Sequence, residues 1–184
     1  MSKRIVAFAA LVSKNSAEQN AFLNRAKKVT SEVAQFSRGW DIVSWLANDT
    51  GKEIDDIRIH DHGFYGGIIG DGDNLGWYTD DYRNSQGDRA SLYYQASTDN
   101  FAYRVSINQI KFAKNCSIVT YGCNCSPFAM ELSRYLGQYK RADVSVTGAD
   151  NNVYEKSGMA YVDRRTDGVS KGARGQFRTY KNGV

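Results

Sequence analysis

Four short apolar runs, separated by stretches long enough to form helices, constrain the fold of this chain more than any other feature. Runs of this length and composition are typical of strands that are buried on both faces of a parallel sheet. Strands joined by helical crossovers give a sheet with helices on its faces. We therefore expect an α/β fold, a three-layer αβα sandwich around a mostly parallel sheet. The four runs are RIVAFAAL (4–11), DDIRIH (55–60), CSIVTYG (116–122) and ADVSVTGA (142–149).

The first predicted helix begins at Ser16, a good N-cap residue with Gln19 three positions later as a capping-box partner. Apolar residues then recur at roughly helical spacing, which predicts that this helix continues up to Gly39. The residues at this spacing are Ala21, Phe22, Val29, Val33 and Phe36. A second, shorter helix is predicted over residues 41–48.

Two further helices are predicted on either side of the third apolar run. Ser106 is interpreted as the cap of a short helix that contains Ile107, Ile110 and Phe112. Ser126 is suited to an N-cap, Pro127 to the first helical position and Gly137 to a helix end. The segment 64–100 is rich in Gly, Asp, Asn and Tyr, so we expect a hairpin or long loop over one end of the sheet. GMAYV and QFRTY predict one or two further short strands.

A length of 184 residues is enough for one domain with its own core. We therefore predict a single domain over residues 1–184, with a core over about 4–150 and a basic extension, 151–184, that completes the sheet. No membrane association is expected, because no stretch approaches the ~18 apolar residues of a membrane span. The N-terminal apolar run is better suited to a buried strand than to an export signal. The expected location is the cytoplasm, with secretion as an effector or toxin domain as a further hypothesis.

The placement of the cysteines argues against a disulfide scaffold, and the distribution of charge argues against a nucleic acid partner. Cys116, Cys123 and Cys125 lie close together, whereas a disulfide scaffold scatters its cysteines, so we expect free thiols and a reducing compartment. The whole net charge of +4 is carried by segment 155–184, which has seven Lys and Arg residues and three Asp and Glu residues. This segment lacks an aromatic platform or a long Lys/Arg block, so we expect a solvated basic face and no nucleic acid partner.

The residues best suited to chemistry lie at the ends of two predicted strands. The chain has two histidines, His60 and His62, in the string HDHG, and Cys123 lies in the string YGCNC. Ligands bind at the carboxyl ends of strands in an open parallel sheet, so an imidazole and a thiol meet there if the two strands are neighbours. Cys123 also precedes a helix, whose N-terminal partial charge favours a thiolate, and histidine is the usual acid or base near neutral pH. The pattern indicates nucleophilic cysteine chemistry.

A hydrophobic strand that ends in His-Gly, followed by one that ends in a small residue and Cys, resembles the signature of caspase-like cysteine peptidases. This group includes caspases, clostripain, gingipains and separase. The matching strings are IRIHDHG and SIVTYGC, and His before Cys is the order of this group. The similarity covers about Ile5 to Ala149, with the two strand ends as its specific parts. FYGGIIGDG is similar to the glycine-rich continuation in bacterial relatives.

The resemblance implies an endopeptidase that uses a cysteine–histidine dyad and no cofactor. It implies that His62 is the acid and base, that Cys123 is the nucleophile, and that the backbone N–H groups of Gly63 and Cys123 form the oxyanion hole. No third residue is obligatory in this group. A glycine after the histidine also has a physical reason, because backbone must approach the substrate closely there. The expected partner is a protein or peptide substrate.

The residues after the nucleophile depart from the caspase pattern. Asn124 and Cys125 replace the caspase string, so aspartate specificity is not carried over. In this fold the residues corresponding to 148–152 usually line the substrate cleft. Candidates for accepting a basic substrate side chain are Asp71, Asp73 and Asp150. Specificity, self-cleavage and oligomeric state stay open.

Two alternatives also stay open. The first is a zinc site, because neutral imidazoles and thiolates are natural zinc ligands, although the H-x-H and C-x-C spacings are not the usual structural pairs. Its ligands would be His60, His62, Cys123 and Cys125, with both histidines on one face of a regular strand. The second is a binding module that keeps the fold without activity, with the acidic 64–100 loop and the basic tail as its interface. Under the peptidase hypothesis, Cys116 is structural and Cys125 is a bystander.

Overall fold

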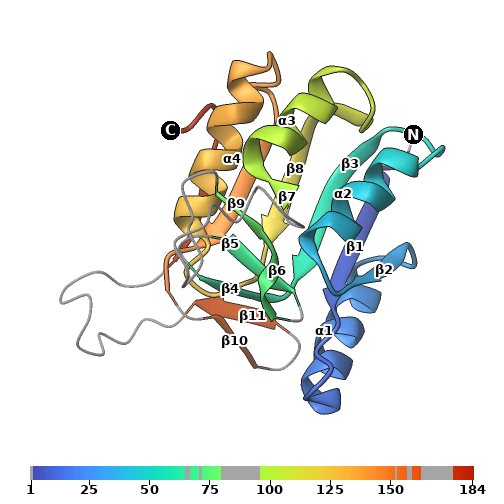
Figure 1. Ribbon diagram of the computed structural model, residues 1–184, viewed down its shortest axis with the longest axis vertical. Helices are drawn as coiled ribbons and strands as arrows, with labels where there is room; N and C mark the ends of the chain where they lie inside the picture. Colours follow the sequence, from blue (N-terminus) through green and yellow to red (C-terminus); the bar gives the residue numbers. More distant parts are fainter. Residues whose placement is uncertain are drawn as a thin grey trace.

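The computed structural model describes residues 2–64, 67–70, 72–79, 96–151, 153–156, 159–162 and 176–184 (Figure 1). The helices are α1 (Ser16–Val29), α2 (Gly39–Asn48), α3 (Thr98–Ser106) and α4 (Ser126–Gln138). The strands are β1 (Ile5–Ala10), β2 (Val33–Phe36), β3 (Ile54–His60), β4 (His62–Phe64), β5 (Gly67–Gly70), β6 (Gly72–Tyr78), β7 (Ala96–Ser97), β8 (Phe112–Thr120), β9 (Ser145–Ala149), β10 (Val153–Lys156), β11 (Met159–Val162) and β12 (Phe177–Tyr180).

Six of these strands form the central sheet, in the order β12-β9-β8-β3-β1-β2. The pairs β1–β2, β1–β3, β3–β8 and β8–β9 are parallel, and β12 pairs antiparallel with β9. The N-terminal strand shows why an uninterrupted apolar run was diagnostic, since Val6 to Ala10 are all buried within β1. The expected α/β fold with a mostly parallel sheet is confirmed.

Helices cover the sheet on both faces. The crossover from β1 to β2 runs in one direction across the sheet, and the crossovers from β2 to β3, β3 to β8 and β8 to β9 run in the other. Because such crossovers are right-handed, α1 lies on one face and α2, α3 and α4 lie on the other. In agreement, α3 packs against α4, and Trp45 of α2 contacts Phe8 of β1 edge-on, with ring centroids 5.4 Å apart.

A small second sheet, β4-β5-β6-β7, is inserted between β3 and α3. The buried side chain of Trp77 on β6 anchors it to the helical layer. The Trp77 ring lies 4.5 Å from the ring of Phe101 in α3 and 5.4 Å from that of Phe128 in α4, measured between centroids. Figure 1 shows this insertion and the hairpin β10–β11 at the end of the sheet where β1 finishes. The hairpin expected within residues 64–100 is present, and residues 80–95 lie outside the described residues.

The prediction that the first helix continues to Gly39 was wrong. The helix ends at Val29, and Val33 to Phe36 form the edge strand β2. Thr30 adopts an extended backbone at the C-cap, and its hydroxyl donates a hydrogen bond to the Ile5 carbonyl at 2.9 Å. Val33 and Phe36 follow Val29 at helical spacing although they lie in a strand, so spacing alone could not find this boundary.

The predicted helix after Ser106 was also misplaced. Ser106 is the last residue of α3, whose N-cap is Ser97, and Phe112 already belongs to β8. The Ser97 side chain accepts a hydrogen bond from Asn100 N–H at 3.1 Å, and Asn108 adopts a positive φ of 60° just beyond the helix. A residue in this left-handed region stops the helix, and its apolar neighbours form the connection to β8.

The helix after Cys123 is present, with different caps from those expected. Cys125 is the N-cap of α4, and Ser126 is its first residue. The Ser126 hydroxyl instead forms a 2.5 Å hydrogen bond with the Tyr180 hydroxyl of β12. The helix passes through Gly137 and ends at Gln138. The short strands predicted at GMAYV and QFRTY are confirmed as β11 and β12, and no described helix is long and apolar enough to cross a membrane.

Candidate active site

The two strands that carry the candidate residues are neighbours in the central sheet. β3 and β8 are parallel, with Ile59 opposite Thr120, and Tyr121 N–H donates a 2.9 Å hydrogen bond to the Ile59 carbonyl. The segments that follow, 60–63 and 121–125, therefore leave the sheet at the same edge. The two strands are thus the neighbours that the sequence prediction required for an imidazole and a thiol to meet.

Gly63 and Gly122 bring the two segments into direct backbone contact. A Cβ atom built on Gly63 would lie 2.9 Å from both the Cys123 carbonyl oxygen and the Gly122 Cα, and would overlap Cys125 Sγ. A Cβ built on Gly122 would lie 2.8 Å from the Gly63 Cα. Such contacts are closer than real Cβ atoms approach their neighbours, so both positions require glycine. The backbones that carry His62 and Cys123 consequently touch.

The imidazole of His62 lies against the first helix. Its Nε2 atom is 2.9 Å from Glu18 Oε1, and its ring meets the Phe22 ring edge-on, with centroids 5.2 Å apart. The His62 side chain is 45% exposed, so solvent and ligands can reach the ring. β4 begins at His62, so the residue lies where the chain turns from the central sheet into the inserted one.

The thiol of Cys123 lies against the C-terminal hairpin. Its Sγ atom accepts a 3.2 Å hydrogen bond from the backbone N–H of Val153, the first residue of β10. The thiol in turn donates a 3.9 Å hydrogen bond to the Val153 carbonyl oxygen, so both backbone groups of Val153 face the sulfur. Within the described residues, the Cys123 N–H donates no hydrogen bond.

The imidazole and the thiol are not hydrogen-bonded to each other in the described part of the chain. His62 faces Glu18 of α1, whereas Cys123 faces Val153 of β10. Catalytic hydrogen bonds are often long in an empty site and tighten when substrate binds, so this separation is compatible with a dyad. The structure thus brings the backbones that carry the two residues into contact without joining their side chains.

The loop that carries Cys123 is fixed on both sides. Asn124 adopts a positive φ of 54°, a conformation that Asn tolerates, and its N–H donates to the Asn151 carbonyl at 3.0 Å. Cys125 is completely buried, with Sγ 3.5 Å from the carbonyl oxygens of Cys123 and Gly67. The Cys125 side chain fills the space between Gly63 and Gly122. This packing role agrees with the prediction that Cys125 takes no part in the chemistry. Cys116 is also completely buried, and burial raises the pKa of its thiol.

His60 has a different environment from His62. It is 5% exposed, and its ring stacks on the Tyr121 ring with centroids 4.6 Å apart. The strand breaks at Asp61, so the prediction that the two histidines share one strand face was wrong. No group of three or more His, Cys, Asp or Glu side chains in the described ranges could hold a metal ion, so the four proposed zinc ligands do not converge.

Asp61 lies buried beneath the junction of the two segments. It is 3% exposed, and its Oδ1 accepts a 3.2 Å hydrogen bond from the Thr120 hydroxyl. That hydroxyl oxygen in turn accepts a 3.2 Å hydrogen bond from Gly122 N–H. Burial raises the pKa of the Asp61 carboxyl well above its usual range. This short chain of hydrogen bonds connects the bend after β3 to the loop before Cys123.

Replacing Asp61 with asparagine is expected to change how stability depends on pH. Because its pKa is raised in the folded state, ionisation of Asp61 opposes folding, and the wild type loses stability as pH rises through that raised value. An asparagine side chain cannot ionise and can still accept from Thr120, so Asp61→Asn should gain relative stability with rising pH. Urea unfolding across pH 5 to 9 measures this, with Glu53→Gln at an exposed carboxyl as the control. A difference between wild type and variant that stays constant with pH contradicts the prediction.

The candidate residues for binding a basic substrate side chain are not supported. The Asp150 carboxylate is occupied, since it accepts from Gln176 N–H at 2.5 Å and from Arg178 Nε at 2.6 Å. Asp71 and the side chain of Asp73 lie outside the described residues. An aspartate already paired with an arginine has little affinity left for a second cation, so the structure gives no basis for basic specificity at Asp150.

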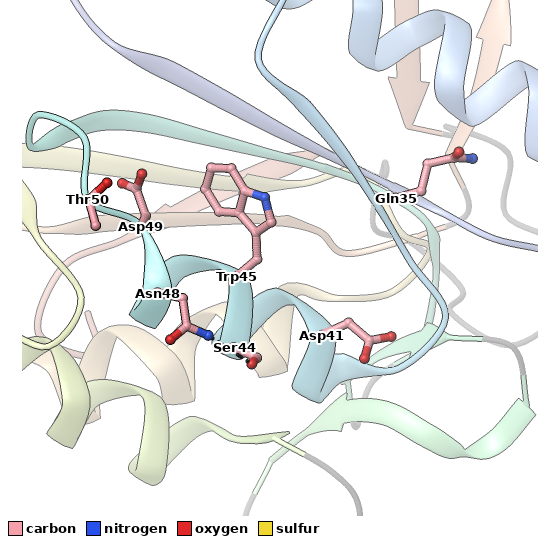
Figure 2. Close-up of a pocket in the computed structure, with 7 residues that line it drawn as sticks. All are labelled: Gln35, Asp41, Ser44, Trp45, Asn48, Asp49 and Thr50. Carbon is pink, nitrogen blue, oxygen red and sulfur yellow. Dashed lines mark hydrogen bonds between the residues drawn. The ribbon is translucent and has the colours of Figure 1, made fainter.

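A groove of about 610 Å³ lies beside α2, and neither His62 nor Cys123 lines it (Figure 2). Figure 2 shows Asp41 and Asp49 near the two ends of α2, with Trp45 between them. Both carboxylates are already engaged, Asp41 by Arg38 N–H at 2.8 Å and Asp49 by Arg4 Nη1 at 2.6 Å. Its lining contains no His or Cys, so this groove is not a candidate for cysteine chemistry. The lining residues are Gln35, Asp41, Ser44, Trp45, Asn48, Asp49 and Thr50.

Sequence reasoning missed Glu18 and Val153 as neighbours of the site. Glu18 lies in the first turn of α1, and the loop after β1 opens at the same edge of the sheet as the ends of β3 and β8. An acidic residue in this turn could therefore have been predicted from the sequence as a neighbour of the site. No comparable signal exists for Val153, which contributes only its backbone N–H.

No family model matches the chain, and neither a curated protein nor a solved structure matches it. Two features of the molecule therefore indicate its function: the geometry of the site and the two strings that the sequence carries there. The strongest geometric element is the contact of Gly63 with the segment that carries Cys123.

Proposed function

We propose that this chain is a cysteine peptidase of the caspase-like type, with Cys123 as nucleophile and His62 as acid and base. The observation that carries the proposal is the backbone contact between Gly63 and the Gly122–Cys123 segment at the shared edge of β3 and β8. Two segments that carry residue types suited to covalent catalysis thus meet through their backbones at one edge of the sheet. The parallel sheet with helices on both faces agrees with the fold that this group implies.

The proposed reaction is hydrolysis of a peptide bond through a thioester. The proton of the Cys123 thiol passes to His62, and the sulfur attacks the carbonyl carbon to form a C–S bond. The C–N bond then breaks as His62 returns this proton to the leaving amine. Water hydrolyses the thioester, with its proton taken up by His62 and passed back to the Cys123 sulfur. The balance requires water only and no cofactor.

The oxyanion that forms during attack needs donors close to the nucleophile. The Cys123 N–H has no hydrogen-bond acceptor within the described residues, and the Gly63 backbone lies against the same segment. A side chain at Gly63 would collide with this segment, so glycine is what allows the two backbones to approach each other. We therefore assign the oxyanion hole to the N–H groups of Gly63 and Cys123, in accordance with the resemblance. A peptide or protein is the substrate class that this arrangement suits.

A library of peptide acyloxymethyl ketones, which alkylate activated cysteines, tests the proposal directly. We expect one adduct per chain, located at Cys123 by mass spectrometry of tryptic fragments, because the activated thiol reacts faster than buried ones. The Cys123→Ala variant should not be labelled, and the matched Cys116→Ala variant should be labelled as wild type, because Cys116 is buried. Labelling that persists in Cys123→Ala, or its absence in the wild type, refutes the proposal.

A further inference from the structure

The first two turns of α1 contact the His62 imidazole at two points. Glu18 and Phe22 are four residues apart, so they lie on the same face of the helix. Glu18 Oε1 lies 2.9 Å from His62 Nε2, and the Phe22 ring meets the imidazole edge-on at an interplanar angle of 83°. One contact restrains the ring at its nitrogen and the other restrains its tilt. Together they define a single orientation of the imidazole.

Glu18 is itself held in place by the cap of the same helix. The Asn15 side-chain oxygen accepts from Glu18 N–H at 3.1 Å, and the Asn15 amide nitrogen lies 3.3 Å from Glu18 Oε2. One carboxylate oxygen therefore faces Asn15 and the other faces His62. A capped first turn is a rigid base for a carboxylate, because the N-cap fixes the helix end from which it projects.

The contact between Glu18 and His62 distinguishes the two ring nitrogens. Nε2 faces the Glu18 carboxylate at 2.9 Å, so Nδ1 is the ring nitrogen that this pair does not engage. We infer that Glu18 is a positioning residue for the peptidase reaction, which holds His62 so that Nδ1 exchanges protons with Cys123 and the leaving amine. This inference rests on the proposed function. The cysteine–histidine dyad that the resemblance implies then has Glu18 as a third, acidic residue.

The exposure of the Glu18–His62 pair separates this role from a contribution to stability. The two side chains are 33% and 45% exposed, and ion pairs in such settings add little to the free energy of folding. Removing Glu18 should therefore leave the melting temperature nearly unchanged. Loss of the fixed ring orientation should instead reduce the rate, since a displacement of about 1 Å in a catalytic group can cost roughly 100-fold.

The first measurement records the order of the His62 ring without any use of activity. The chain has only two histidines, so the ring C–H signals of His62 are identified by their loss in His62→Ala. Carbon-13 relaxation should show a rigid ring in the wild type and a mobile ring in Glu18→Ala. Glu18→Gln keeps an oxygen that accepts from Nε2–H, so it should retain a rigid ring. Glu53→Ala, which removes an exposed carboxylate elsewhere, should match the wild type.

The second measurement is the rate of Cys123 alkylation by a peptide acyloxymethyl ketone. The limiting rate at saturating probe should fall about 10- to 100-fold in Glu18→Ala, with an unchanged half-saturating concentration, because the chemistry and not the binding is impaired. Glu18→Gln should recover most of this rate and Glu53→Ala should keep it.

The outcomes separate this inference from the peptidase proposal. A ring that stays rigid in Glu18→Ala, or a limiting rate that does not change when the ring becomes mobile, overturns the positioning role. If the wild-type chain is not labelled at Cys123, the peptidase proposal is refuted, and Glu18 then has no catalytic role. In that case the relaxation data still decide whether Glu18 holds the His62 ring.

Discussion

Replacing His62 or Cys123 with alanine is expected to reduce peptide-bond hydrolysis by roughly 10⁴-fold or more, the scale on which single members of such catalytic groups act. Alanine at 123 removes the sulfur that forms the acyl bond. Alanine at 62 removes the group that carries the proton to the leaving amine. Each variant should keep its fold, because both side chains are partly exposed. Cleavage of a mixed peptide library, followed by mass spectrometry, measures the loss.

A double variant and a matched thiol control sharpen this test. Because the two residues act as one unit, His62→Ala combined with Cys123→Ala should lose no more activity than either single change. Cys116→Ala also removes a thiol, but from the buried middle of β8, and should retain hydrolysis. Full activity in either His62→Ala or Cys123→Ala would falsify the assignment. Thermal melting of each variant shows whether a loss reflects unfolding.

The position of the site could be predicted because it depends on strand ends. The strings IRIHDHG and SIVTYGC each join an apolar run to glycine, and both runs became neighbouring parallel strands with Ile59 opposite Thr120. Burial of an apolar strand is a strong local signal, and the carboxyl edge of a parallel sheet gathers whatever follows such strands. The meeting of residues 60–63 with 121–125 follows from these two facts.

The remainder of the site could not be predicted, because it depends on contacts between elements. The Val153 N–H that reaches Cys123 comes from a hairpin whose position depends on tertiary packing, and any residue except proline could supply it. The difference between His60 and His62 arises from the break at Asp61, which no period in DDIRIHDHG reveals. The edge strand at Val33 was assigned to a helix because four residues are too few to show a period.

Gly63→Ala is expected to have the largest effect on stability among single changes at the site. The new Cβ would lie 2.9 Å from the Cys123 carbonyl oxygen and would overlap Cys125 Sγ, so backbone must shift. Overpacking of this kind costs about 1–3 kcal/mol or more, and each kcal/mol lowers the melting temperature by roughly 2–4 °C for a chain of this size. Gly51→Ala is the matched control, because its Cβ would meet only the end of the Arg4 side chain, at 2.6 Å. Thermal melting of both variants compares the two.

Hydrolysis by Gly63→Ala should fall as well, at temperatures where the variant is still folded. A shift of Gly63 relative to Cys123 moves one oxyanion donor away from the other, and loss of one such donor costs roughly 10²- to 10³-fold. The double variant Gly63→Ala with Cys125→Ala then separates the clash with the Cys125 sulfur from the clash with the Cys123 carbonyl oxygen. It removes the overlap with sulfur but leaves the contact with the Cys123 carbonyl, so stability should recover only in part. Full recovery of stability and activity would mean that glycine is needed at position 63 only to accommodate the buried Cys125 thiol. The contact between the Gly63 backbone and the segment of Cys123 would then no longer support a shared site for His62 and Cys123.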